Sequence, residues 1–155
     1  MFIMGSGYIN CNISKKTYSA FKGIVDDSLT EVTAEMLNGV TSISNYAFYQ
    51  CANLTSAEIP SSVISVGYMA FYGCSSLTSV IMSNGVQYIG GSAFYDCSLL
   101  ASVTVEATTP PTLENANAFA NVDQNLIIYV PSESVETYKA AAGWSTYASK
   151  IQAIP

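Results

Sequence analysis

A motif that recurs every 23 residues constrains this chain more than any other feature of its sequence. The copies are NYAFYQCANLTSAEIP at 45–60, YMAFYGCSSLTSVIMS at 68–83 and GSAFYDCSLLASVTVE at 91–106. Each contains Ala-Phe, then a cysteine and a leucine at fixed distances. A fourth copy, displaced by two residues, has Ala118-Phe119 and carries Val122 in place of the cysteine. Several positions in phase over three copies indicate tandem structural repeats.

Within one copy, the spacing of the apolar residues predicts a turn followed by a strand. Ala47, Phe48 and Cys51 have the i, i+1, i+4 spacing of one face of a short helical turn. The alternation at Ala57 and Ile59 is typical of a short strand with one face inward. One such unit cannot bury its apolar face, whereas stacked units can. We therefore expect an α/β solenoid of about four to five repeats, with short parallel strands on one side and short helical turns on the other.

The ends of a solenoid need caps, and this sequence divides accordingly. We expect a single domain (1–155) with an N-terminal cap or degenerate repeat at 1–28, repeats at 29–131 and a helical C-terminal cap at 132–155. Ser132 is a suitable N-cap for the last segment, and Gly143 is a suitable helix stop. The side chains expected to cover the last repeat are Val135, Tyr138, Ala142, Trp144, Tyr147 and Ile151.

The composition excludes several classes of function. The net charge is −6, and the chain has no arginine and no histidine. A nucleic-acid binder needs a basic surface, which is missing here. Without histidine, neither a Ser-His-Asp nor a Cys-His nucleophile can form, and zinc sites with histidine are excluded. No apolar run is long enough to insert in a membrane, and no export signal or anchor is visible in this chain. We expect no enzymatic activity, no catalytic residue, no cofactor and no metal.

The cysteine of the motif admits several interpretations: a metal ligand, half of a disulfide, a reactive thiol or a filler of the core. Cys51, Cys74 and Cys97 would stack roughly 5 Å apart in neighbouring repeats, which does not forbid a disulfide. Three equivalent cysteines cannot pair evenly, however, and Val122 replaces the fourth. Free cysteine is among the most buried residue types. The pattern favours a core position, with a disulfide or metal site as the alternative, and Cys11 stands alone near the N-terminus.

Two aromatic rows follow from the same period. The spacing of the phenylalanines favours a structural ladder in the core. It consists of the three cysteines together with Phe48, Phe71, Phe94 and Phe119. A tyrosine follows each of the first three phenylalanines, and this row consists of Tyr49, Tyr72 and Tyr95. These tyrosines should lie half exposed on the convex side, where they either cover the turns or form a contact site, including one for self-association.

The outward face of the strands is the better candidate for binding. If Ala57 and Ile59 point inward, their neighbours point outward, and extended surfaces of this kind are how solenoids usually bind partners. The residues expected on this sheet face are Ser56, Glu58, Ser79, Ile81, Ser102, Thr104 and Tyr129. A face of hydroxyl groups with few charges suits a protein or a glycan, because few charges lose their hydration on binding.

The repeat unit resembles the BspA-type leucine-rich repeat family. The segment VTSISNYAFYQCANLTSAEIPSSV at 40–63 is similar to the family motif almost position by position, and LIIYVPSESVETYKAAAGWSTYASKI at 126–151 resembles a common terminal segment. The resemblance covers roughly residues 29–152. It implies a leucine-rich repeat solenoid, a bacterial source, an extracellular or cell-surface location and a role in adhesion or protein binding, and it supplies no catalytic residue.

The leading hypothesis is therefore a non-enzymatic binding or adhesion module whose preorganised sheet face holds a protein or glycan partner. The alternative is a structural spacer or appendage module within a larger bacterial surface or phage assembly. That alternative predicts self-association through the tyrosine row.

Overall fold

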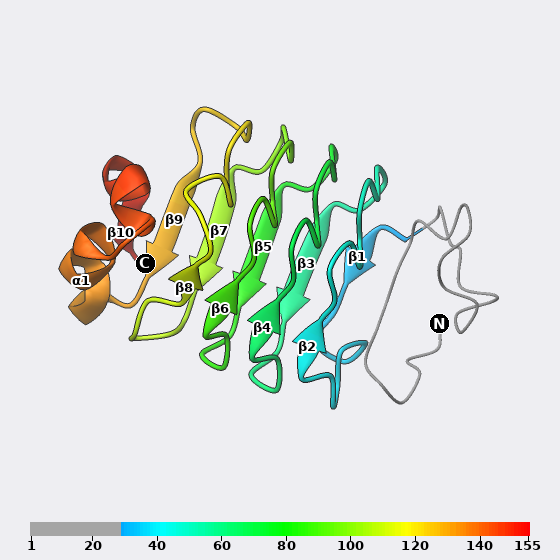
Figure 1. Cartoon of the computed structure of the whole chain (residues 1–155), viewed down its shortest axis with the longest axis horizontal. Coiled ribbons are helices and arrows are strands. Elements are labelled where there is room, and N and C mark those ends of the chain that lie inside the picture. The colour runs from blue at the N-terminus through cyan, green and yellow to red at the C-terminus, as the bar shows by residue number, and fades with distance from the viewer. Residues whose placement is uncertain (1–28) are drawn as a thin grey trace.

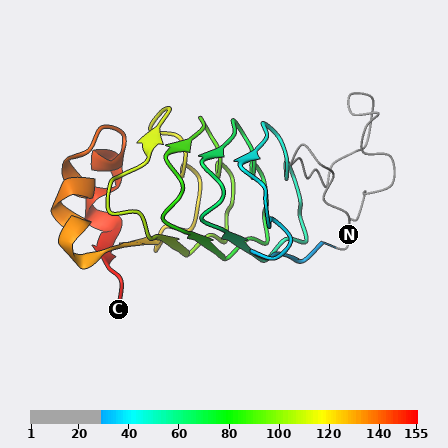
Figure 2. The ribbon, with the colours of Figure 1, turned by 90° about the horizontal axis from the view of Figure 1, so that it is seen from below.

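The described chain winds in successive coils along one axis, and every coil before the C-terminal end contributes a strand to each of two sheets (Figure 1). The structure is a computed structural model that describes residues 29–155. The expected N-terminal cap at 1–28, with Cys11, lies outside the described residues. The parallel strands of the predicted solenoid are present, and Figure 2 shows the two sheets on different sides of the coils.

The larger sheet has six parallel strands in the part of the chain that is described. In sheet order they are β1 (Glu31–Val32), β3 (Ser56–Ile59), β5 (Ser79–Met82), β7 (Ser102–Val105), β9 (Ile127–Val130) and β10 (Ile151–Ala153). The register follows the sequence period, since Ala57 pairs with Val80 and Val80 with Val103. These residues all point inward. Side chains along a strand alternate between its two faces, and the pairing places equivalent residues of successive repeats side by side, so they share the same face.

A smaller sheet lies on a second side of the coils. Its strands are β2 (Ser42–Ile43), β4 (Ser65–Val66), β6 (Tyr88–Ile89) and β8 (Thr112–Leu113), again parallel and in chain order. The second residue of each strand is buried, and the first faces outward and is exposed or partly exposed. The sequence analysis did not predict this sheet, because two-residue strands leave almost no alternation to detect.

The third side of each coil contains the Ala-Phe motif, and here the predicted helical turn was wrong. No helix occurs between residues 29 and 131. The backbone N–H groups of Tyr46, Phe48 and Gln50 donate to carbonyls of the following coil, at 3.0, 2.6 and 2.7 Å. Those of Ala47 and Tyr49 donate within their own coil, at 3.2 Å each. A regular helix would keep all of these bonds inside the coil. The segment therefore acts as a third ladder between coils.

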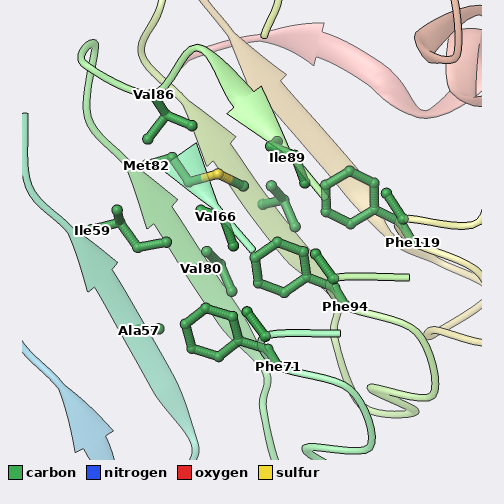
Figure 3. Packing of buried hydrophobic residues seen from close by; sticks show 14 of the residues in the cluster. Ala57, Ile59, Val66, Phe71, Val80, Met82, Val86, Ile89, Phe94 and Phe119 are labelled. Atoms are coloured by element: carbon green, nitrogen blue, oxygen red, sulfur yellow. The ribbon is translucent and has the colours of Figure 1, made fainter. Parts of the chain in front are cut away.

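The core fills the space between the three sides with equivalent residues from successive coils. Figure 3 shows the rings of Phe71, Phe94 and Phe119 in a row beside the inward side chains of the strands. Their centroids are 5.0 and 5.3 Å apart and their planes nearly parallel, and Phe48 extends the stack with a centroid 4.8 Å from that of Phe71. All four rings are almost completely buried. Removing one ring would cost about 3–5 kcal/mol of stability.

The C-terminal cap closes the last coil with two short helices and a strand. A 3-10 turn (Ser132–Ser134) leads into α1 (Val135–Ala140), and a second 3-10 helix (Trp144–Lys150) leads into β10. Trp144 and Tyr138 are fully buried. The indole N–H of Trp144 donates to the backbone carbonyl of Pro111 at 2.7 Å. The hydroxyl of Tyr138 donates to the backbone carbonyl of Ala107, also at 2.7 Å. These bonds satisfy polar groups that the cap buries.

Three details of the predicted cap were wrong, and one of them is the helix stop, because the helix ends at Ala140 and Gly143 precedes the next 3-10 helix. The hydroxyl of Ser132 bonds the carboxylate of Glu133 instead of capping the helix, and the helix begins after a 3-10 turn at Ser134. The hydroxyl of Ser134 donates to the carbonyl of Thr108 at 2.8 Å, which ties the start of the helix to the preceding coil. Ala142 is exposed instead of facing inward, because the helix ends at Ala140.

Candidate functional site

The outward side of the larger sheet presents two rows of side chains that cross the strands. One row is formed by Ser56, Ser79, Ser102 and Ile127, which are paired through β3, β5, β7 and β9. The next outward row is formed by Glu58, Ile81, Thr104 and Tyr129 on the same strands. We call these eight residues the sheet face. It brings together all seven residues that the sequence analysis placed there, and Ile127 completes the first row.

Exposure on the sheet face is uneven. Glu58 is exposed, and Ile81 near its centre is 42% exposed, which is high for a large aliphatic side chain. The other members are partly buried by their neighbours. Between residues 36 and 105 the only charged side chains of the chain are Glu58 and Asp96. The sheet face is therefore a hydroxyl and apolar surface with a carboxylate at one end.

A row of threonines borders the sheet face where the strands begin. The hydroxyl of Thr55 donates to the carbonyl of Thr30 at 2.8 Å, and that of Thr78 donates to the carbonyl of Thr55 at 3.0 Å. These exposed hydroxyls join neighbouring coils, so they fix the spacing of the sheet face. The sequence analysis did not identify them, although their 23-residue spacing was a usable signal.

The three tyrosines of the predicted row lie on the third side of the coils. Tyr49 and Tyr72 stack with centroids 5.2 Å apart, and Tyr72 and Tyr95 with centroids 5.3 Å apart, at interplanar angles of 16° and 6°. All three are partly exposed. Partial desolvation raises the pKa of Tyr72, and the nearby carboxylate of Asp96 raises it further. Tyr46, which the sequence analysis missed, meets Tyr49 edge to face at 5.7 Å.

The cysteines differ in their bonding. Cys74 and Cys97 are free thiols, completely buried in the core. Each donates a hydrogen bond from Sγ, at 3.1 Å, to a phenylalanine carbonyl 26 residues earlier. The pKa of Cys97 lies well above its usual range because Cys74 interacts with it and because it is buried. Cys51 also lies in the buried core and is disulfide-bonded, which is the alternative that the sequence left open for the cysteines.

Neither a metal site nor a membrane-spanning helix is found in the part of the chain that the structure describes. No three His, Cys, Asp or Glu side chains come together there in a group that could hold a metal ion. The helices of the C-terminal cap are too short and too polar to cross a bilayer.

Comparison with known families identifies the repeat. The family model for the BspA type leucine-rich repeat region, in six copies, matches residues 12–142. A comparison with curated proteins gives no significant match. Six copies exceed the four to five that we expected, because the match begins before residue 29, in a segment where the Ala-Phe-Cys motif is degenerate. The match covers most of the chain, and the coils repeat the motif in register, so this chain belongs to the BspA-type leucine-rich repeat family.

Proposed function

We propose that this chain is a non-catalytic binding module that holds a partner protein on its sheet face. The observation that supports the proposal most directly is the exposure of Ile81 on a face where most of the other residues carry hydroxyl groups. Interfaces commonly have an apolar or aromatic anchor near the centre and a polar rim. Ile81 and Tyr129 supply the anchors, and Ser56, Ser79 and Ser102 supply the polar surroundings.

The sheet face is preorganised for this role. Each outward residue alternates with a buried one, such as Val80 or Met82 beside Ile81, and those buried residues pack completely in the core. The backbone cannot shift without disturbing that packing. A partner therefore meets side chains that are already in place, which lowers the entropy cost of binding.

The size of the sheet face sets the kind of complex that we expect. Even the whole larger sheet, with six strands at the usual spacing and at most four residues in each, spans at most about 24 Å by 13 Å. This gives roughly 300 Å², well below the approximately 800 Å² that one partner buries in a stable complex. We therefore expect weak, fast-exchanging binding by one module, which becomes firm only when several modules act together.

We also propose that the module works outside the cell, as an adhesion component. The disulfide of Cys51 supports this location, because disulfides persist in oxidising compartments and are rare in the cytosol. The scarcity of charges on the repeats supports adhesion to a surface, since few charges lose their hydration on contact.

The chain itself offers a matched control for testing the sheet face. The test variant combines Ser79→Lys, Ile81→Glu and Tyr129→Ala. The control makes the same three kinds of change on the smaller sheet, as Ser65→Lys, Ile64→Glu and Tyr88→Ala. Ile64 is 43% exposed, close to the 42% of Ile81, so both variants should remain folded.

Protein arrays probed with multimeric wild-type and variant modules give the measurement. We expect proteins bound by the wild type to be retained by the control and lost by the sheet-face variant. Retention of the same proteins by the sheet-face variant, with its circular dichroism unchanged, would rule out this face as the binding surface.

A further inference from the structure

The tyrosine row ends abruptly at Tyr95. The coil that follows is aligned by two backbone bonds, from Phe94 N–H to Ala118 at 2.8 Å and from Asp96 N–H to Ala120 at 3.1 Å. The position equivalent to Tyr95 in that coil is Ala120. The row therefore stops where a tyrosine is replaced by a methyl group, although the phenylalanine stack beneath continues through Phe119.

The replacement leaves the outer side of Tyr95 without the next ring of the stack. Rings of this row lie 5.2–5.3 Å apart, so the missing ring corresponds to a space about one ring thick. Ala120, which stands in place of the next ring, is partly exposed, and the neighbouring Asn121 is exposed. Within residues 29–155, the aromatic contact of Tyr95 is with Tyr72 on the opposite side.

Polar groups are held in position at the rim of this space. The side-chain amide of Asn121 donates to the hydroxyl of Tyr95 and to the carboxylate of Asp96, both at 3.0 Å. The carboxylate of Asp96 also lies near Tyr72, where it adds to the rise in the pKa of that tyrosine caused by desolvation. A carboxylate has about four acceptor positions, and a phenol oxygen both donates and accepts. Asp96 and Tyr95 thus keep capacity for a ligand while their neighbours orient them.

We infer that this space binds one pyranose ring of a neutral glycan, independently of the sheet face. A pyranose has C–H groups on its flat faces and hydroxyls around its edge. Its C–H groups can pack on the electron-rich face of Tyr95. Its hydroxyls can form hydrogen bonds with Asp96, Asn121 and the tyrosine hydroxyl. Ala120 leaves the room that a ring needs.

A cationic ligand fits this geometry less well. Binding of an ammonium group by tyrosines requires ring faces directed at the charge. In this row both faces of Tyr72 and one face of Tyr49 are stacked on neighbouring tyrosines, so the exposed edges of these rings carry the positive side of the ring quadrupole. Tyr95 has one face without a stacked ring, which is enough for a sugar but gives a cation one ring instead of a cage.

Two substitutions at Ala120 test the inference. Ala120→Tyr continues the row and fills the space, whereas Ala120→Ser leaves it open. Tyr95→Ala removes the ring itself, and Tyr129→Ala on the sheet face serves as a control elsewhere. Saturation-transfer NMR and calorimetry with the methyl glycosides of glucose, galactose, mannose and N-acetylglucosamine give the measurement, with tetramethylammonium as the cationic probe.

We expect at least one glycoside to bind the wild type, Ala120→Ser and Tyr129→Ala equally, with at least a tenfold loss in Ala120→Tyr and Tyr95→Ala. Circular dichroism establishes that each variant is folded, and Tyr95→Ala decides the question if Ala120→Tyr does not fold. The inference is overturned if no glycoside binds the wild type, if Ala120→Tyr or Tyr95→Ala binds as well as the wild type, or if only tetramethylammonium binds. Loss of array partners in the sheet-face variant, with glycoside binding intact, separates the two surfaces.

Discussion

The thiol of Cys74 donates a hydrogen bond to the backbone carbonyl of Phe48, 26 residues earlier and one coil away, at 3.1 Å. The same bond joins Cys97 to Phe71. The carbonyl of Phe48 also accepts the N–H of Cys51 at 3.2 Å, so this oxygen has one donor from its own coil and one from the next. The cysteine of the motif therefore fills core volume and also links neighbouring coils.

Substitutions at Cys74 separate these two contributions. Cys74→Val keeps an apolar side chain of similar size, as Val122 does in the last copy, but removes the donor. Cys74→Ala removes both. We expect a loss in the free energy of unfolding of about 0.5–1.5 kcal/mol for valine, and about 1–2 kcal/mol more for alanine because a cavity remains. Urea unfolding measures both values. Equal losses for the two variants would show that packing contributes little.

Thiol labelling should distinguish the folded from the unfolded chain. Cys74 and Cys97 have no exposed surface, and the raised pKa of Cys97 keeps it protonated at pH 8. Only the thiolate reacts with disulfide reagents. We expect neither residue to react in the folded protein without reductant, and both to react rapidly in 8 M urea, as followed by mass spectrometry of peptides. Rapid labelling of either in the folded state would contradict the buried placement.

The sequence predicts the coil and its register well, because both depend on repetition. Residues such as Ala57 and Val80 keep one face of each strand apolar, and a shift by one residue would expose every one of them. Repetition alone thus determines which strands pair and which side faces the core. The same alternation directs Ile81 outward, onto the sheet face, because it stands between the buried Val80 and Met82.

The turn around the Ala-Phe motif could not be predicted in this way. It places Tyr46 and Gln50 in the left-handed region, with φ of 61° and 55°, and neither residue type favours that conformation. What stabilises it is the ladder of N–H groups donated to the following coil. Such bonds join residues more than 20 positions apart, so no pattern of neighbouring residues in the sequence predicts them. The thiol donor of Cys74 could not be predicted for the same reason, because its acceptor lies 26 residues earlier.

Close stacking of coils makes several glycines sensitive to substitution, and Gly85 has the shortest such contact. A Cβ added at Gly85 would lie 1.9 Å from the carbonyl oxygen of Ser61 in the preceding coil. A Cβ at Gly39 would meet nothing within 4 Å, although φ is 79° there. We expect Gly39→Ala to cost about 1 kcal/mol of stability from backbone strain. Gly85→Ala should cost about 3 kcal/mol or more, because backbone must move. Thermal unfolding compares the two, and a smaller effect at Gly85 would mean that the coils separate easily.

Alkaline pH should destabilise the fold through groups that the cap and the core bury. Burial raises the pKa of Tyr138 and Tyr147, and interaction with Cys74 together with burial raises that of Cys97. A raised folded-state pKa means that the group stays protonated in the folded protein but ionises on unfolding. Its stabilising contribution is present below the unfolded pKa and is lost as pH rises above it.

The wild-type free energy of unfolding should therefore be nearly constant between pH 6 and 8 and should fall steadily above about pH 9, where unfolded cysteine and then tyrosine ionise. Tyr138→Phe removes one ionising group together with its hydrogen bond to Ala107. We expect this variant to lose about 1–2 kcal/mol at pH 7 and to show a shallower decline above pH 10. Urea titrations from pH 6 to pH 11 measure both slopes, with Tyr129→Ala as a control at a partly exposed tyrosine. Identical alkaline slopes for wild type and Tyr138→Phe would show that Tyr138 does not contribute to the alkaline loss of stability.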